Sequence, residues 1–145
     1  MATVNAYLTF NGSCEAAFNF YKSVFGGEFA FIGKFKDMPQ DAAKPMSEAD
    51  GEKIMHVSLP ISAETILMGS DTGGEWGAHY KEGNNISISI NTSSKAEADR
   101  LFNGLSANGQ VTMPMDTTFW GSYFGMFIDK FGINWMVSFD ETPQQ

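Results

Sequence analysis

The sequence predicts an α+β protein made of two tandem βαβββ modules that form a curved mixed sheet, shaped as a cup. The first observation behind this prediction is an internal repeat. An offset of 80 positions brings Asn5–Asn11 onto Asn85–Asn91. Both segments alternate apolar residues with smaller or polar ones at period two, which is typical of a half-buried strand.

The second observation is a helical segment after each of these strands, with its apolar residues spaced three and then four apart. Ser13 is a plausible N-cap of the first helix, and Ser94 with Glu97 forms a capping box for the second. Gly26-Gly27 and Asn108-Gly109 end the two helices. The same offset superposes the apolar faces, with Phe18, Tyr21 and Phe25 falling on Ala98, Leu101 and Leu105.

Three strand-like segments follow each helix. In the first half they are Glu28–Phe35, Ile54–Pro60 and Thr65–Ser70, and in the second half Val111–Met113, Tyr123–Ile128 and Asn134–Phe139. With 145 residues the chain fits one domain, residues 1–145, in which module one covers about 3–71, a linker about 72–84 and module two about 85–140. The segment 36–53, rich in charges and prolines, is a long loop that either covers a site or lacks order.

Composition excludes several classes of function. The net charge of −8 and only 9 Lys and Arg residues argue against a nucleic-acid partner, because phosphate binding needs clustered cations. No apolar run approaches a membrane span, and no signal peptide is visible, so we expect a cytoplasmic protein without a membrane partner. The single cysteine, Cys14, lies in the first helical turn, where we expect a neutral packed thiol.

Period two divides each predicted strand into two faces. Ile86, Ile88 and Ile90 are expected to be buried against the helices, which leaves the odd-numbered residues of that strand on the other face. The face opposite the helices would carry Asn5, Tyr7, Thr9, His56, Ser58, Asn85, Ser87, Ser89, Met136 and Ser138. An apolar wall with a few polar anchors is typical of a small-molecule pocket.

These segments resemble the vicinal oxygen chelate superfamily, which includes glyoxalase I, bleomycin-resistance proteins and extradiol dioxygenases. The greatest similarity is to its PhnB-like group, often labelled 3-demethylubiquinone-9 3-methyltransferase-like. The stretches that carry the resemblance span nearly the whole chain: Tyr7–Gly12, Glu15–Tyr21, Phe25–Gly27, Ile54–His56, Leu67–Asp71, Phe119–Gly121, Phe124-Gly125, Asp129, Phe131-Gly132 and Trp135.

The resemblance implies a glyoxalase/bleomycin-resistance fold and a homodimer. It also places the superfamily's four metal ligands at Asn5, Leu67 (Met68 if the register slips by one), Asn85 and Met136. Leu and Met supply no hard donor, and the usual transition-metal sites need His, Cys or carboxylates. We therefore expect no metal at these positions and no cofactor. The two asparagines would instead bind a polar ligand group or hydrogen-bond within the sheet.

His56 is the best candidate for an acid, a base or an anchor, although a purely structural ring is an equal alternative. Trp120 would stack on a ligand, contact a second copy or belong to the core. Asp129 is expected to cap a turn, Trp135 to be core, and His79 to lie at the surface. No glycine-rich nucleotide-binding turn follows a strand, so a methyltransferase finds no support in the sequence.

The function expected from the sequence is therefore small-molecule binding in the cup of the sheet, with Asn5, Tyr7, His56, Leu67, Asn85, Ser87, Trp120 and Met136 as candidate contacts. One alternative is a lyase, isomerase or dioxygenase with atypical metal ligands such as His56 and Asp71. Another is a protein that sequesters a cationic drug in an acidic groove. The sequence does not decide whether a bond is made or broken.

Overall fold

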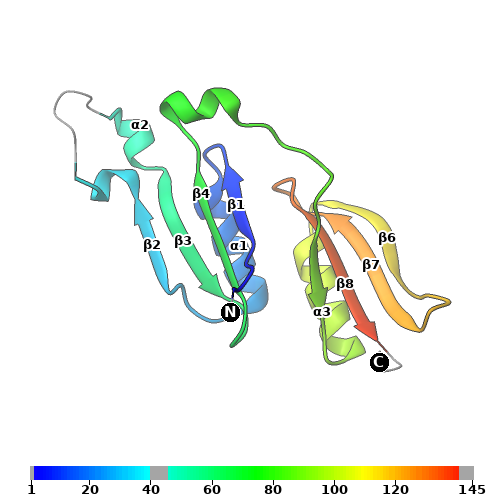
Figure 1. Cartoon of the computed structure of the whole chain (residues 1–145). Helices are drawn as coiled ribbons and strands as arrows, with labels where there is room; N and C mark the ends of the chain where they lie inside the picture. The colour runs from blue at the N-terminus through cyan, green and yellow to red at the C-terminus, as the bar shows by residue number, and fades with distance from the viewer. Residues whose placement is uncertain (1, 40–45, 141–145) are drawn as a thin grey trace. The chain divides into compact units, whose positions relative to one another are not determined.

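The computed structural model describes residues 2–39 and 46–140, and the chain divides into two compact units, Met1–Lys81 and Glu82–Gln145 (Figure 1). The division falls inside the linker that the sequence predicts at residues 72–84. Each unit contains one four-stranded mixed sheet and one helix of 12 residues, so the α+β class and the repeated module are confirmed. The pairing of the two modules into one domain stays a prediction.

The first unit follows the predicted order of one strand, one helix and three strands. Its sheet has the order β1-β4-β3-β2, in which β1 runs parallel to β4 and the other neighbours are antiparallel. Its main elements are β1 (Tyr7–Phe10), α1 (Cys14–Phe25), β2 (Phe31–Lys34), β3 (Ile54–Pro60) and β4 (Ile66–Asp71).

The second unit repeats this topology. Its sheet has the order β5-β8-β7-β6, with β5 parallel to β8. Its elements are β5 (Ile88–Asn91), α3 (Lys95–Ser106), β6 (Gln110–Thr117), β7 (Ser122–Ile128) and β8 (Asn134–Asp140). Strand β6 is longer than the three residues predicted for it. Nearly all of its residues are exposed, so no alternation of apolar and polar residues marks its full length in the sequence.

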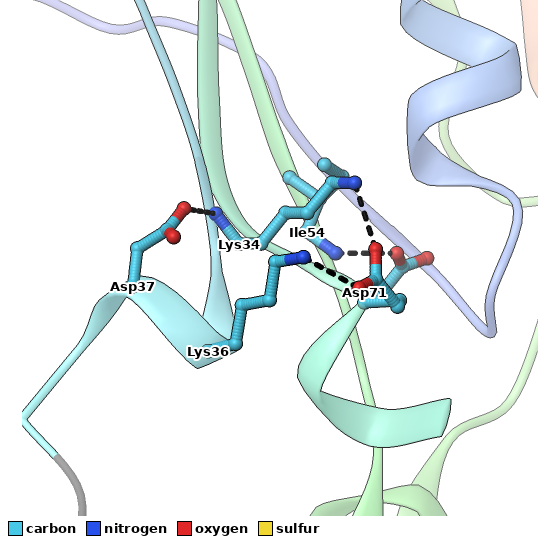
Figure 2. A network of polar contacts seen from close by, with 6 residues as sticks. Lys34, Lys36, Asp37, Ile54 and Asp71 are labelled. Carbon is cyan, nitrogen blue, oxygen red and sulfur yellow. Dashed lines mark hydrogen bonds and ion pairs between the residues drawn. The ribbon is translucent and has the colours of Figure 1, made fainter. Parts of the chain in front are cut away.

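The predicted loop 36–53 contains two short elements, the 3-10 helix η1 (Phe35–Asp37) and the helix α2 (Glu48–Gly51). Residues 40–45 lie outside the described residues. The two ends of the segment are joined by the Phe35 amide, which donates to the Lys53 carbonyl at 3.0 Å. Lys34 and Lys36 bind the two carboxylate oxygens of Glu52 at 2.9 and 2.6 Å, and Figure 2 shows both lysines with Asp37 at this place. The predicted linker likewise contains a 3-10 helix, η2 (Gly74–His79).

Each helix packs on one face of the sheet of its own unit (Figure 1). A Cβ added at Gly69 would lie 2.7 Å from the Phe18 ring of α1, so this row of the sheet faces the helix directly. In the second unit a Cβ at Gly125 would lie 2.8 Å from Phe102 of α3. The absence of a side chain at both glycines lets an aromatic ring of the helix approach the sheet closely.

The buried residues follow the predicted faces. Phe10, Val57, Leu59 and Leu67 form the core of the first unit with Phe18 and Tyr21 of α1. In the second unit the core contains Phe127, Trp135 and Val137 together with Ala98, Leu101, Phe102 and Leu105 of α3. Trp135 is therefore core, as its parity in the strand predicts.

Ile86 departs from the predicted pattern. It was expected to be buried beside Ile88 and Ile90, yet its side chain is 78% exposed. The physical reason is that β5 begins only at Ile88, so Ile86 precedes the strand and is not held in its pleat.

The helix caps were predicted in part. Ser94 accepts the Glu97 amide at 3.1 Å, and Glu97 accepts the Ser93 amide at 3.1 Å, one residue before the expected reciprocal partner. Ser13 occupies the N-cap position of α1 but makes no capping hydrogen bond with its side chain. The Asp71 carboxylate caps that helix instead, by accepting the amides of Gly12 and Cys14 at 2.8 and 3.0 Å. A cap from the distant strand β4 has no local sequence signal.

Asp129 caps its turn as predicted. One carboxylate oxygen accepts the amides of Phe131 and Ile133 at 2.8 and 3.0 Å. The other accepts the indole N–H of Trp135 at 2.8 Å, which fixes the largest core side chain of the unit. No helix among the described residues is long and apolar enough to cross a membrane.

Candidate functional site

The face of each sheet opposite its helix is called here the open face. In the first unit it holds two neighbouring rows of side chains, because residues paired across strands share a face. One row contains Tyr7, Met68, Ser58 and Phe31. The next row contains Thr9 opposite Ser70 and His56 opposite Gly33. The prediction that His56 and Ser58 lie opposite the helix side is confirmed, since the intervening Val57 is fully buried.

His56 lies between two aromatic rings on this face. Its Nδ1 is 3.3 Å from the Tyr7 hydroxyl oxygen, and the two rings are stacked with centroids 5.7 Å apart. On the other side the Phe31 ring lies 5.9 Å from the imidazole. The sequence places these three residues on strands β1, β3 and β2, so only the sheet brings them together.

The absence of a side chain at Gly33 leaves room for the Phe31 ring. A Cβ at Gly33 would lie 3.0 Å from Phe31 Cζ and 3.1 Å from its Cε1, so the Phe31 ring lies over the glycine. Gly33 is paired with His56 in the sheet. Phe31 was not among the predicted contacts. The alternation of Phe31 and Gly33 in β2, opposite Ser58 and His56, is the signal that could have identified it.

The open face of the first unit carries no carboxylate among the eight residues of these rows. Its polar groups are the imidazole of His56, the phenol of Tyr7 and the hydroxyls of Thr9, Ser58 and Ser70. Tyr7 and Phe31 are 48% and 49% exposed, so half of each ring is available for contact. In a chain of net charge −8 this patch is locally free of negative charge.

The open face of the second unit is different. One row is formed by Ser89, Met136, Met126 and Met113, and the next by Asn91, Ser138, Phe124 and Asp116. Ser138 donates to the Asn91 amide oxygen at 2.9 Å. Thioethers and a phenyl ring make these two rows largely apolar, and their one carboxylate is that of Asp116 at the β6 edge.

Trp120 adds to the apolar character of that face. It lies in the turn between β6 and β7, with its ring 5.0 Å from Phe119 and 6.3 Å from Phe124. Trp120 is 52% exposed and therefore is not core, which leaves ligand stacking or a contact with a second copy.

The other predicted contacts lie in different places. Met136 is on the open face of the second unit as predicted, and Asn85 and Ser87 are exposed residues that precede β5. Asn5 precedes β1, and its side-chain oxygen accepts the Ile66 amide at 3.1 Å, which is the alternative of hydrogen bonding within the sheet. Leu67 is buried on the helix side, so the open-face residue is its neighbour Met68, as the one-residue slip allowed.

A metal at the four positions implied by the resemblance does not fit the residues present. The Asn5 oxygen is engaged by a backbone amide, and Met68 and Met136 offer only thioethers. Among the side chains that the structure describes, at residues 2–39, 46–73 and 77–140, no three of His, Cys, Asp or Glu gather closely enough to hold a metal ion.

The alternative metal pair of His56 and Asp71 is wrong. Asp71 is buried at 4% exposure, and its two oxygens accept backbone amides of Gly12, Cys14 and Ile54. It lies at the helix side of β4, whereas His56 lies on the open face. Figure 2 shows Asp71 directed toward the Ile54 amide.

Two further side chains have no part in the open face. Cys14 is fully buried, and its burial, together with the negative charges of Asp71 and Glu15, holds the pKa of the thiol far above its ordinary value. The thiol is therefore neutral and packed, as predicted. His79 ends η2 as an exposed residue, which confirms its expected surface position.

Comparison with known proteins places this geometry in a family. Residues 2–138 match the family described as 3-demethylubiquinone-9 3-methyltransferase. The chain belongs to this family. The protein PA1353 of Pseudomonas aeruginosa is 40% identical, and the match covers 97% of this chain and 98% of that one with a TM-score of 0.82. A putative 3-demethylubiquinone-9 3-methyltransferase, PhnB protein, from Bacillus cereus is 22% identical over 95% and 99% of the two chains, with a TM-score of 0.73.

The chain also shares its fold with a solved protein described as a glyoxalase/bleomycin resistance protein/dioxygenase family enzyme. That enzyme, from Burkholderia phytofirmans, has a TM-score of 0.59 and 12% identity, with 94% and 99% of the chains covered. The predicted family, labelled 3-demethylubiquinone-9 3-methyltransferase, is therefore confirmed, and the solved neighbours confirm the predicted glyoxalase-type fold. The family description names a methyl transfer, but the helix N-terminus after β1, where nucleotide-binding folds bind phosphate, is occupied here by the Asp71 carboxylate.

Proposed function

We propose that this family member binds a small molecule on the open face of its first sheet without the metal of the glyoxalase superfamily. The observation that carries the proposal is the His56 cluster, in which a polar imidazole lies between two half-exposed rings on an otherwise apolar and hydroxyl-lined surface. Apolar walls with a few oriented polar groups are what ligand sites provide. The donor chemistry at positions 5, 68, 85 and 136 supports binding without a metal.

Ligand binding is tested by a thermal-shift screen of the purified protein against metal chlorides and a set of small aromatic and aliphatic acids, amines and alcohols. A ligand at about 100 times its Kd adds about 2.7 kcal/mol to the free energy of unfolding, which is a clear rise in Tm. The open-face variant Met68→Lys should lose the shift. The matched control Glu64→Lys, at an exposed residue beside the same strand, should keep it.

The result that overturns the proposal is a hit that raises Tm equally in the wild type and in Met68→Lys. A screen in which only a stoichiometric metal gives a shift, confirmed by elemental analysis, would favour a metalloenzyme instead. Amine hits alone would point to sequestration of a cationic compound.

We also propose that the protein is a homodimer. Phe119 and Trp120 are neighbouring aromatic rings with centroids 5.0 Å apart, and they are 98% and 52% exposed. Contiguous exposed apolar surface of this kind is typical of a partner interface. Light scattering after size exclusion should give twice the chain mass of 15.9 kDa. A monomer at micromolar concentration would contradict this proposal.

A further inference from the structure

We propose that His56 binds a hydrogen-bond acceptor, a carboxylate or enolate oxygen, on an aromatic small molecule that lies against Tyr7 and Phe31. This inference rests on the proposed function and names the ligand class that the open face of the first unit takes.

The first argument concerns the proton on the imidazole. A neutral imidazole has one N–H donor and one bare nitrogen acceptor. The Tyr7 hydroxyl oxygen lies 3.3 Å from Nδ1, and either group could be the donor of this hydrogen bond. We assign the phenol O–H as the donor, which leaves the proton on Nε2. No hydrogen bond to Nε2 is found within the described residues of this unit, so an N–H at Nε2 is open to a ligand acceptor. Tyr7 is in this way a positioning residue, because it selects the tautomer that donates.

The second argument concerns the rings. Tyr7 and Phe31 lie 5.7 and 5.9 Å from the imidazole centroid, with half of each ring exposed. Aromatic rings at such separations favour offset or edge contacts with a further ring. Met68 and Ser58 lie between Tyr7 and Phe31 in the same row, so the floor beneath a bound ring is a thioether and a hydroxymethyl group. A planar aromatic ligand therefore fits this surface better than a flexible polar one.

The third argument concerns charge. No residue of the two rows is a carboxylate, and Lys34 at the end of β2 is engaged by Glu52. The donors near an acceptor beside His56 are therefore the imidazole N–H and the hydroxyls of Ser58 and Ser70. These two rows place no fixed negative charge beside it. The same rows of the second unit carry serine hydroxyls and the Asn91 amide but no histidine, and they include the carboxylate of Asp116.

The chain contains two histidines, so NMR signals from histidine rings can be assigned to single residues and used to test the proposal. Protein labelled with ¹⁵N at histidine gives ring signals for His56 and for His79, and the exposed His79 is an internal control. Benzoate, benzyl alcohol and benzylammonium serve as probes, because they share a ring and differ only in the polar group. Wild-type protein should show the Nε2–H tautomer at His56, and benzoate should shift the His56 signals and leave those of His79 unchanged.

Two variants separate the donor from the rings. His56→Phe keeps an aromatic ring and removes the N–H, so benzoate binding should be lost while benzyl alcohol binding remains. Tyr7→Phe should change the His56 tautomer and weaken benzoate binding by about two- to tenfold, the range expected for one neutral hydrogen bond. Gly33→Ala should displace the Phe31 ring and weaken all three probes.

The inference fails if benzylammonium or benzyl alcohol shifts the His56 signals as strongly as benzoate, or if benzoate shifts none of them. In that event the backbone amide signals of open-face residues distinguish the two proposals. If other compounds still shift these amides, only the acceptor assignment is lost. If no compound of the thermal-shift screen shifts them, the proposed binding function fails as well.

Discussion

The carboxylate of Asp71, at the end of β4, accepts the amide of Cys14 at the start of α1 at 3.0 Å, across 57 positions of sequence. The same carboxylate accepts the Gly12 and Ile54 amides, so one buried side chain joins β4, β3 and the helix. Burial, and after it the charge that caps the helix, raises the pKa of the Cys14 thiol, so the cap and the neutral thiol belong to one arrangement.

Asp71→Ala should destabilise the protein by roughly 3 kcal/mol or more, because three amides lose a charged acceptor in a buried place. Urea unfolding followed by circular dichroism measures the change in the free energy of unfolding. Asp37→Ala is the matched control, since Asp37 also accepts a backbone amide, that of Lys34 at 3.0 Å, but in an exposed place. We expect the control to change stability by less than about 0.5 kcal/mol, and equal losses in the two variants would contradict the buried cap.

Removal of the Ser94 hydroxyl should cost about 1 kcal/mol, whereas removal of the Ser13 hydroxyl should cost almost nothing. Ser94 accepts the Glu97 amide, but Ser13 makes no capping hydrogen bond with its side chain. Ser94→Ala and Ser13→Ala are compared by urea unfolding under identical conditions. A larger loss for Ser13→Ala would show that α1 depends on its local cap and not on Asp71.

Alkaline pH should weaken the fold through Cys14. The pKa of the thiol is raised in the folded state above its ordinary value of 9.0, chiefly by burial and then by Asp71 and Glu15. Above about pH 9 the unfolded chain releases the thiol proton while the folded chain keeps it, so this contribution to stability is present below that pH and falls as the pH rises. The slope approaches about 1.4 kcal/mol per pH unit for one proton.

The Cys14 contribution is isolated by comparing wild type with Cys14→Ala over a range from about one and a half pH units below the thiol's ordinary pKa of 9.0 to about one and a half above it. The wild type should lose more stability over this range than the variant, and iodoacetamide should modify Cys14 only when the protein unfolds. Parallel pH profiles, or rapid alkylation of native protein, would refute the prediction.

Glu52 should titrate at unusually low pH. Hydrogen bonds from Lys34 and then Lys36 lower the pKa of its carboxyl from 4.5 to about 2. Because the folded pKa lies below the ordinary one, this contribution to stability is present above about pH 4.5 and is lost as the pH falls toward 2. The carboxyl carbon signal of Glu52 in NMR gives the pKa directly.

The cause of the Glu52 shift is tested by Lys34→Met with Lys36→Met, in which the carboxyl should titrate near its ordinary pKa. High salt should move the wild-type pKa in the same direction, because both ion pairs are at the surface. A Glu52 pKa that stays low in the double variant would rule out the lysines as its cause.

Local sequence patterns were sufficient for the elements and their faces. Ile54–Pro60 was predicted with both ends correct, and the alternation within it correctly placed Val57 under the helix and His56 on the opposite side. Leu67 shows the limit of such patterns, since a shift of one residue inverts the face of every side chain in a strand. Only the pairing of Tyr7 with Met68 decides that register.

The candidate site was predicted in its parts and not as an assembly. Tyr7 and His56 were each assigned to the polar face, but nothing in the sequence indicates that Tyr7 reaches His56 or that Phe31 lies over Gly33. These contacts depend on the strand order β1-β4-β3-β2, in which β2 and β3 lie beyond β4 from β1. The order of strands that are distant in the sequence produces no periodic pattern of residues from which it could be predicted.

The sequence by itself determined the repeated module, its helices and the polarity of its strands, because these follow from periodicities of 2 and 3.6 residues that any segment carries within itself. The tertiary structure decided which residues act together: that Asp71 and not Ser13 caps α1, and that His56 is oriented by Tyr7. The physical reason is that hydrogen bonds and ring contacts depend on distance in space, and the distances of Asp71 from Cys14 and of Tyr7 from His56 are set only when the sheet has formed.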